Sequence, residues 1–430
     1  MKATASAVPR LPGLDFIRAA AIAWVMLYHA SVFGLTSQSH WLVRFGWMGV
    51  DLFFVLSGFL IAEQFLRPLS RGLKPSYSRF FGRRLLRTIP AYLAVVAVYF
   101  CIPIVRDQQD IQPLWQFLTF TENLFIDIST PKAFSQVWAL CVEEQFYLAF
   151  PVAVAFISFR PSSAKTMAAI VSLLILGMAI RGYVWLHSVA SIPFDLTAQP
   201  QPRAFMQLIY YPTWTRLDGF LMGIIAAVVR NFRPATWNML TARANLILGL
   251  GLSGIVASTF FFGGYVTGFW ASVFAYPLLS ASIALVVIAA TDNSCLIGRY
   301  ALPGVATLAT GAYSLYLSHK AVFHFAQMAT SHFPAEEKWA AFPLALLGAL
   351  LAGAGLYWTV ERPFLKIRDR LEGPSRSSLA TAPSADRAPI HARSCGAPDP
   401  FVDADEFQRV GAGTEKAFDT ELTQRQAAKR

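Results

Sequence analysis

The most constraining feature of this sequence is a series of long apolar segments separated by short polar connections. Each segment has roughly 17 to 25 residues, the length that an α-helix needs to cross the hydrocarbon core of a bilayer. We count ten, at residues 16–36, 46–66, 88–105, 144–159, 166–186, 213–229, 245–262, 269–290, 304–328 and 339–360. The predicted fold is therefore all-α: a polytopic helical bundle in a membrane with about ten transmembrane helices.

The composition supports a membrane protein. The 430 residues are 55% hydrophobic and only 14% charged, whereas a soluble globular domain carries about 25% charged residues to face water. The mean hydropathy of +0.46 excludes a disordered chain. The four cysteines lack metal-ligand spacing, so no metal centre is expected, although a Cys101–Cys141 disulfide stays open as an alternative.

The distribution of basic residues predicts the orientation. The connection after the second segment holds seven bases and no acid, namely Arg67, Arg71, Lys74, Arg79, Arg83, Arg84 and Arg87. Such segments stay in the cytoplasm. Acids predominate in 106–137, which therefore lies outside, and alternation puts both termini inside. The positive charge of +11 is spread between apolar segments and shows no nucleic-acid-binding signature, so no nucleic-acid partner is expected.

The chain divides into two parts by composition. Residues 1–370 form the predicted transmembrane domain. Residues 371–430 are rich in Ser, Ala, Pro and mixed charge, which predicts a disordered cytoplasmic tail. The first apolar segment contains Asp15, Arg18 and His29 and is therefore expected to remain in the protein rather than to be a cleaved signal peptide.

Several ionisable residues lie within the apolar segments, where charge is costly and marks candidate functional sites. Arg18 and His29 are 11 residues apart, about three helical turns, and so share one face of the first helix, where Asp15 can pair with Arg18. Counting helical rise from the outer boundary places His29 and Asp51 at similar depth. The other ionisable residues expected in the same leaflet are Glu143, Glu144, Arg216, Asp218, His319 and His324. This grouping suits general acid–base chemistry, and a proton or ion pathway is the alternative.

A second group predicts an anion site on the cytoplasmic side. Arg84 and Arg87 are at i and i+3 and can present two guanidinium groups to one phosphate-bearing ligand. Arg18 lies at a similar depth. The alternative is that these arginines only anchor the connection on the cytoplasmic side.

Four segments together resemble the membrane-bound acyltransferase 3 family. They are LDFIRAAAIAWVMLYHA (14–30, with an Arg-x10-His spacing), GVDLFFVLSGFL (49–60), YSRFFGRRLLRTIPAY (77–92, with RxxR) and WALCVEEQFYLAFP (138–151). Weaker matches are RLDGFLMG, YSLYLSH and VERPF at 216–223, 313–319 and 360–364. The chain departs from the family pattern at Phe16, where a small residue is common; this affects helix packing rather than chemistry.

The resemblance implies a multi-pass enzyme of the bacterial inner membrane. Such an enzyme transfers an acyl group, commonly acetyl, from cytoplasmic acyl-coenzyme A to a hydroxyl of a carbohydrate or glycolipid, such as a surface polysaccharide. By position, the resemblance implies that His29 and Glu143 are catalytic and that Arg18, Arg84 and Arg87 bind the donor. Asp51 is a third predicted catalytic residue because of its depth, which is similar to that of His29. His29 either accepts the acyl group or deprotonates the acceptor, and Glu143 or Asp51 orients its ring.

Two other expectations bear on partners and on the class of protein. The fused extracytoplasmic domain of some family members is not visible in this sequence, so the acceptor is expected to meet either the membrane domain itself or a separate acceptor-handling protein. The competing class is a transporter or flippase that uses the same charged residues as a pathway, although no internal repeat is evident. A third class is a non-catalytic membrane scaffold.

Overall fold

The computed structural model describes residues 11–127, 129–159, 163–192, 200–262 and 268–372. Ten long helices run through this part: α1 (Pro12–Val32), α3 (Gly49–Leu69), α4 (Tyr77–Cys101), α7 (Trp138–Phe159), α8 (Ser163–Val184), α10 (Asp218–Phe232), α12 (Ala244–Phe262), α13 (Tyr276–Ala290), α15 (Val305–Ala329) and α17 (Phe342–Leu356). The shorter helices are α2 (Trp41–Arg44), α5 (Leu114–Leu118), α6 (Glu122–Phe125), α9 (Pro200–Phe205), α11 (Pro234–Thr241), α14 (Leu296–Arg299), α16 (Ala335–Lys338) and α18 (Arg362–Glu372). No strand occurs in the described residues, and the all-α prediction is confirmed.

Each predicted apolar segment coincides with one long helix, and seven of them are long and apolar enough to cross a membrane. These seven spans are Gly46–Leu69, Tyr77–Cys101, Ser135–Ile157, Ala164–Val189, Ala244–Phe262, Ala271–Ala290 and Trp339–Leu371. Of the other three helices, α10 has only 15 residues, and α1 and α15 contain ionisable side chains that lower their hydropathy. The seven spans indicate a multi-pass membrane protein. The count of ten crossings and the side on which each terminus lies stay predictions.

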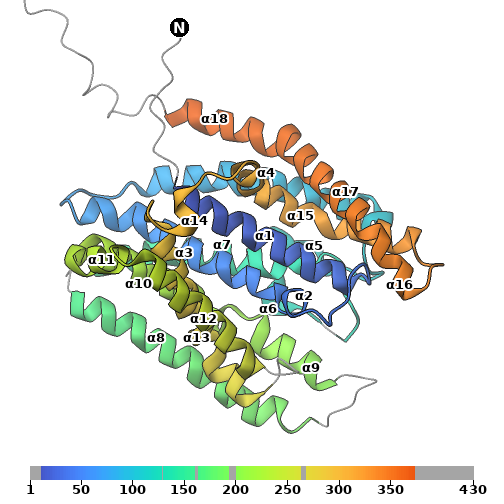
Figure 1. Ribbon diagram of the computed structural model, residues 1–430, viewed down its shortest axis with the longest axis horizontal. Coiled ribbons are helices and arrows are strands. Elements are labelled where there is room, and N and C mark those ends of the chain that lie inside the picture. The colour runs from blue at the N-terminus through green and yellow to red at the C-terminus, as the bar shows by residue number, and fades with distance from the viewer. Residues whose placement is uncertain (1–10, 128, 160–162, 193–199, 263–267, 373–430) are drawn as a thin grey trace, which may run out of the picture. The chain divides into compact units, whose positions relative to one another are not determined.

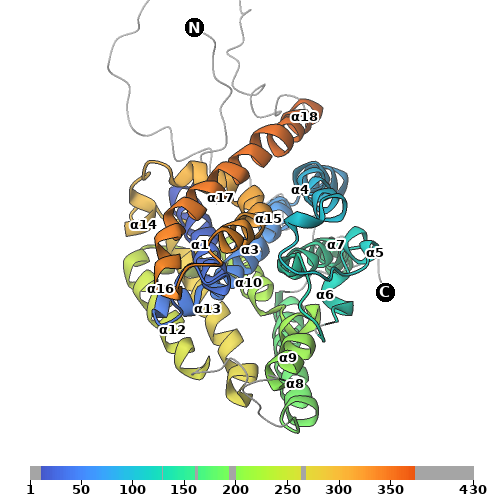
Figure 2. The ribbon, with the colours of Figure 1, turned by 90° about the vertical axis from the view of Figure 1, so that its right-hand side faces the viewer.

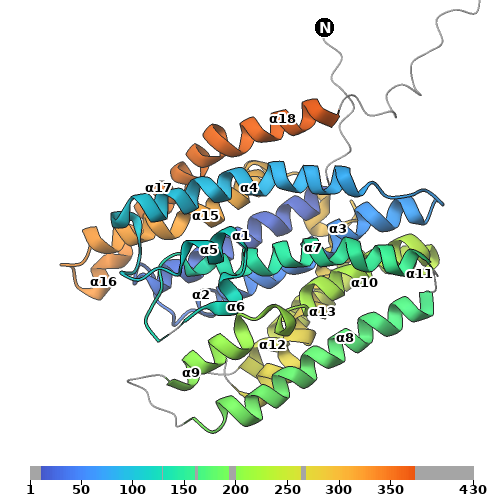
Figure 3. The same cartoon turned by 180° about the vertical axis from the view of Figure 1, so that it is seen from behind.

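Helix α3 lies at the centre of the bundle, where it packs on α1, α10 and α13. Figure 1 shows α1 between α15 and α3, with α8 at the edge, and Figure 3 shows the same order from behind. Close contact between α3 and α10 depends on glycine: a Cβ atom added to Gly223 would lie 2.3 Å from the carbonyl oxygen of Val55. The two backbones can approach only because no side chain separates them.

Between α4 and α7, the described residues 102–127 and 129–137 form a folded connection rather than a loose loop. It contains α5 and α6, and α6 packs against α7 (Figure 2). Asp107 fixes the connection because its carboxylate accepts a hydrogen bond from the backbone N–H of Phe134 at 3.1 Å. Phe134 has a left-handed φ of 61°, so this turn is held in an uncommon backbone conformation. The connection therefore has a defined position against the helix ends.

Three predictions from the sequence differ from the structure or fall outside the described residues. Helix α4 begins at Tyr77, earlier than the apolar segment at 88, because its arginine-rich first turns are helical but polar. Cys101 and Cys141 are free thiols, so the alternative of a disulfide between them is wrong. The predicted disordered tail, 371–430, lies almost entirely outside the described residues.

Candidate active site

Two imidazole rings from helices distant in sequence meet inside the bundle. His29 of α1 and His319 of α15 face each other, with 2.8 Å between Nδ1 of His29 and Nε2 of His319. The Nδ1 atom of His319 lies 2.8 Å from the carbonyl oxygen of Leu315, one turn earlier in α15. His319 is fully buried, whereas His29 keeps some accessible surface. His29 is therefore the member of the pair that a substrate can reach.

These hydrogen bonds fix the tautomers of the neutral pair. A carbonyl oxygen only accepts, so Nδ1 of His319 carries the hydrogen and its Nε2 atom is an acceptor. The Nδ1 atom of His29 must then donate, which leaves an unprotonated lone pair on Nε2 of His29. A free lone pair on an oriented ring is what a general base or a nucleophile requires.

Two neighbours of His319 in α15 bind to the connection that precedes α7. The ammonium group of Lys320 lies 2.9 Å from a carboxylate oxygen of Asp107, and both side chains are buried. One turn before Lys320, the Tyr316 hydroxyl donates to the carbonyl oxygen of Gln136 at 2.7 Å. The part of α15 that carries His319 is thus held from two sides.

Two hydroxyl groups form a hydrogen-bond chain that ends at the carboxylate of Glu143. The Tyr147 hydroxyl donates to Oγ of Ser57 at 3.0 Å, and Oγ of Ser57 donates to Oε1 of Glu143 at 2.5 Å. The guanidinium group of Arg84 stacks on the Tyr147 ring at 3.8 Å from the ring centre, a cation–π contact. The structure therefore links Glu143 to α3 and to the arginines, while the ring partner of His29 is His319.

The three arginines predicted to bind an anion form one electrostatic group, the arginine cluster: Arg18 of α1 and Arg84 and Arg87 of α4. Arg18 interacts with both of the others, and all three act on Glu143. Arg18 pairs with Asp15 at 3.3 Å, as predicted. Among the described residues, the guanidinium groups of Arg84 and Arg87 form no hydrogen bond or ion pair. Incompletely neutralised cations held together favour an anionic ligand.

Asp51 lies in a different environment. One of its carboxylate oxygens is 2.9 Å from Nη2 of Arg216, and both side chains are almost fully buried. The Arg216 guanidinium also lies 4.3 Å from the ring centre of Tyr276. The structure therefore places Asp51 in a buried ion pair between α3 and the start of α10, and not beside His29.

Sequence reasoning missed a second buried ion pair and the hydroxyl chain. Arg181 is 0% exposed and forms two hydrogen bonds, at 2.7 and 3.0 Å, with the carboxylate of Asp218. Arg181 could have been identified from the sequence, because a charged residue inside the fifth apolar segment marks a candidate site. Ser57 carries no such signal, since serine is common in membrane helices. His319 was expected in this leaflet, but nothing in its spacing indicated His29 as its partner.

The site therefore combines an oriented imidazole, a half-buried glutamate and a cationic cluster. Nowhere in the part of the chain that the structure describes do three or more His, Cys, Asp or Glu side chains lie close enough together to hold a metal ion. The chemistry available from these residues is acid–base or nucleophilic chemistry on a ligand that carries negative charge.

Comparison with known proteins agrees with this geometry. The chain is 26% identical over 345 residues to an O-acetyltransferase of Staphylococcus aureus, covering 73% of this chain and 51% of that protein. It is 25% identical over 327 residues to a putative peptidoglycan O-acetyltransferase of Bacillus subtilis (72% and 48% coverage). It is 24% identical over 325 residues to a peptidoglycan O-acetyltransferase of Listeria monocytogenes (72% and 49% coverage). The chain spans about half the length of these curated relatives.

No solved structure matches the chain. Residues 11–358 match the acyltransferase domain of the acyltransferase 3 family, and this range contains every helix that contributes to the imidazole pair and to the arginine cluster. The protein belongs to the acyltransferase 3 family.

Proposed function

We propose that this protein is an O-acyltransferase that moves an acyl group, preferably acetyl, from cytoplasmic acyl-coenzyme A to a hydroxyl of a carbohydrate acceptor. The observation that carries the proposal is the open Nε2 atom of His29, oriented by His319. The family match supports acyl transfer. The names of two relatives specify peptidoglycan, which supports a cell-surface glycan or its lipid-linked precursor as the acceptor.

The donor would bind through its phosphates and reach inward with its acyl end. The arginine cluster supplies positive charge on the face predicted to be cytoplasmic. Arg18 and His29 share a face of α1 about 16 Å apart by helical rise. A long pantetheine arm can therefore place a thioester near His29 while the diphosphate stays at Arg84 and Arg87.

His29 can perform the transfer in two ways. As a general base, Nε2 removes the acceptor hydroxyl proton while the oxygen attacks the thioester carbonyl; the carbon–sulfur bond breaks and the proton passes to the leaving thiolate. As a nucleophile, Nε2 first takes the acyl group and releases coenzyme A, and the hydroxyl then takes the acyl group from the ring. In both routes His319 accepts the hydrogen bond from Nδ1 and stabilises positive charge on the ring.

The other predicted catalytic residues receive distinct roles. We propose that Glu143, fixed by Ser57, positions Arg84 and Arg87 for the donor. We propose a structural role for Asp51, because removing one partner of a buried ion pair leaves the other charge uncompensated. The proposed location is the bacterial inner membrane.

The test compares surface glycans and extractable glycoconjugates by mass spectrometry. Cells produce the wild-type protein or His29→Ala at equal membrane abundance, with His187→Ala as the matched control, because His187 is an exposed histidine. We expect an alkali-labile acyl mass in wild-type and control cells and its loss with His29→Ala. An unchanged acyl pattern in all three strains would contradict the proposed function and would make a flux assay for transport the next experiment.

A further inference from the structure

A groove of about 570 Å³ opens where α3 ends and α4 begins. Its charged lining comprises five cations, Arg67, Arg71, Lys74, Arg79 and Arg83, and one acid, Glu63. Glu63 already accepts a hydrogen bond from Asn231 and lies 3.8 Å from Arg230, so it neutralises little of this charge. The groove, hereafter the basic groove, has a large excess of positive charge on the face predicted to be cytoplasmic.

The floor of the basic groove is aromatic. Phe65 and Phe80 line it, are 1% and 4% exposed, and pack against each other with ring centres 4.9 Å apart. A volume of several hundred Å³ with an apolar floor and a charged rim suits a nucleotide, since the base contacts the apolar part and the phosphates contact the rim.

The basic groove leads to the arginine cluster along one face of α4. Arg79, Arg83 and Arg87 are at i, i+4 and i+8, so they share that face over about 12 Å of rise. The first two line the groove, and Arg87 interacts with Arg18 inside the bundle. Positive charge is thus continuous from the groove to the cluster.

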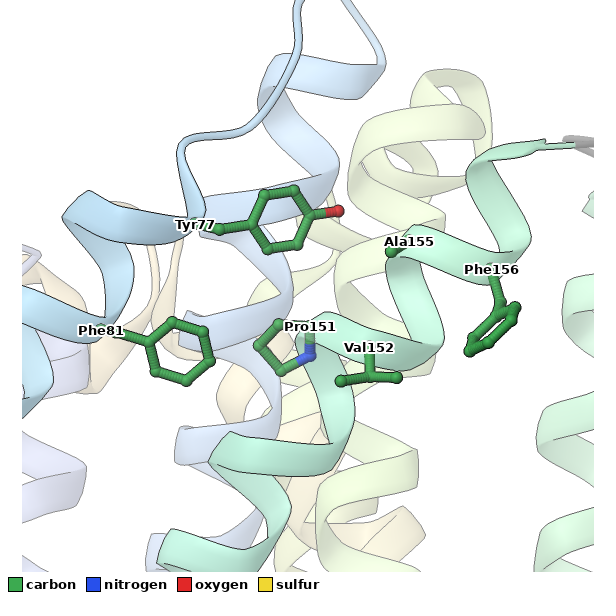
Figure 4. A pocket seen from close by; sticks show the side chains of 6 residues that line it. All are labelled: Tyr77, Phe81, Pro151, Val152, Ala155 and Phe156. Atoms are coloured by element: carbon green, nitrogen blue, oxygen red, sulfur yellow. The ribbon is translucent and has the colours of Figure 1, made fainter.

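A smaller pocket on another side of the same turns has a different character. It has a volume of about 230 Å³ and lies between Tyr77 and Phe81 of α4 and the second half of α7, where Pro151 and Phe156 face it (Figure 4). Its lining is apolar, and it shares no residue with the basic groove. The apolar surface that would suit a lipid chain is therefore separate from the cations.

We propose that the basic groove is the subsite for the nucleotide end of the acyl donor. Arg67, Arg71 and Lys74 contact its 3′-phosphate, the base lies over Phe65 and Phe80, and the diphosphate extends along α4 to Arg84 and Arg87, where the pantetheine arm begins. This inference rests on the proposed function. It assigns the nucleotide end of the donor to the basic groove, whereas the arginine cluster holds only the part of the donor next to the arm.

The experiment measures equilibrium binding of coenzyme A, 3′-phosphoadenosine 5′-phosphate and S-acetylpantetheine to the full chain in phosphatidylcholine nanodiscs. The test variant is Arg67→Gln/Arg71→Gln/Lys74→Gln. The control variant, Arg233→Gln/Arg243→Gln/Lys366→Gln, removes the same charge from exposed positions outside the groove. We expect the test variant to weaken binding of both phosphate-bearing probes at least tenfold, while S-acetylpantetheine binding and the control variant are unchanged.

One outcome would overturn the inference and leave the proposed function standing: the test variant binds coenzyme A like the wild type. If this variant, purified from cells, also loses bound phosphatidylglycerol in native mass spectrometry, the groove is a lipid-headgroup site. A wild-type chain that binds no coenzyme A and forms no acyl ester in cells would instead overturn the proposed function as well.

Discussion

At the scale of single residues, the candidate site depends on hydrogen-bond direction more than on residue type. His29 was predicted from its spacing to Arg18, and the structure supplies what spacing does not contain: a partner, His319, that lies 290 positions later in the chain. The carbonyl oxygen of Leu315 sets the direction of both hydrogen bonds. A pair formed across the bundle leaves no periodic signal within either helix, so its members are visible in the sequence and their pairing is not.

Replacing His319 tests whether it positions His29. We expect His319→Ala to lower kcat by about 10²- to 10⁴-fold, the usual contribution of a positioned acid–base group, with little change in the KM for the donor. His319→Gln should recover part of the loss, because its amide oxygen can accept from Nδ1 of His29. Steady-state assays of acyl transfer in membranes provide both constants. Equal kcat values for His319→Ala and the wild type would show that His29 needs no partner.

Glu122, in the connection between α4 and α7, predicts a pH dependence of stability. Burial raises the pKa of this carboxyl from 4.5 to about 8, although the attraction of Lys320 lowers it. Neither carboxyl oxygen has a hydrogen-bond partner among the residues that the structure describes. Between these pH values the folded chain holds a proton that the unfolded chain has lost. The folded-to-unfolded ratio should therefore fall up to tenfold per pH unit as the pH rises from about 4.5 to 8.

The measurement is the melting temperature in detergent between pH 5 and 8. We expect the wild-type melting temperature to fall relative to that of Glu122→Gln as the pH rises, because glutamine cannot ionise. Glu337→Gln, at an exposed position, should follow the wild-type curve. Parallel curves for the wild type and Glu122→Gln would mean that the carboxyl ionises as readily in the folded chain as in the unfolded chain.

At the scale of the elements, apolar length predicted every long helix, but helix contacts depend on features that length does not encode. Helices α3 and α10 approach closely because Gly58 and Gly223 present backbone to each other: a Cβ atom on Gly58 would lie 2.3 Å from the carbonyl oxygen of Phe220. Helix α4 was predicted to begin too late because its first turns carry arginines, which a search for apolar residues skips. These are the turns that form the basic groove.

The α3–α10 contact predicts the effect of a single methyl group. Gly223→Ala should destabilise the protein by about 1–3 kcal/mol, because overpacking a close backbone contact forces the helices apart. Gly249→Ala in α12 is the matched control: a Cβ atom there meets nothing within 4 Å, and alanine is the better helix former. Thermal unfolding in detergent should show a lower melting temperature for Gly223→Ala alone, and equal shifts in the two variants would contradict the packing explanation.

At the scale of the whole molecule, the sequence predicts an orientation that the helices do not settle. The cation-rich end of α3 and start of α4 and the acid-rich connection 102–137 lie at opposite ends of α4, and the positive-inside rule assigns them to opposite sides of the membrane. This charge asymmetry is legible without any structure. The number of crossings cannot be predicted in the same way, because the ionisable groups of the site lower the hydropathy of α1 and α15. Length and hydropathy alone therefore select only seven spans.

The number of crossings determines where the two ends of the chain lie. An even number such as ten places both on the same side, and an odd number such as seven places them on opposite sides. We therefore expect alkaline phosphatase fusions, which are active only outside the cytoplasm, to be inactive at either terminus and active when inserted at residue 129, in the acid-rich connection. A fusion at residue 72, in the basic connection, should be inactive and serves as the control at equal abundance. Activity at only one terminus would establish an odd number of crossings and would require that an odd number of the ten long helices, such as one or three, lie within the bundle without crossing the membrane.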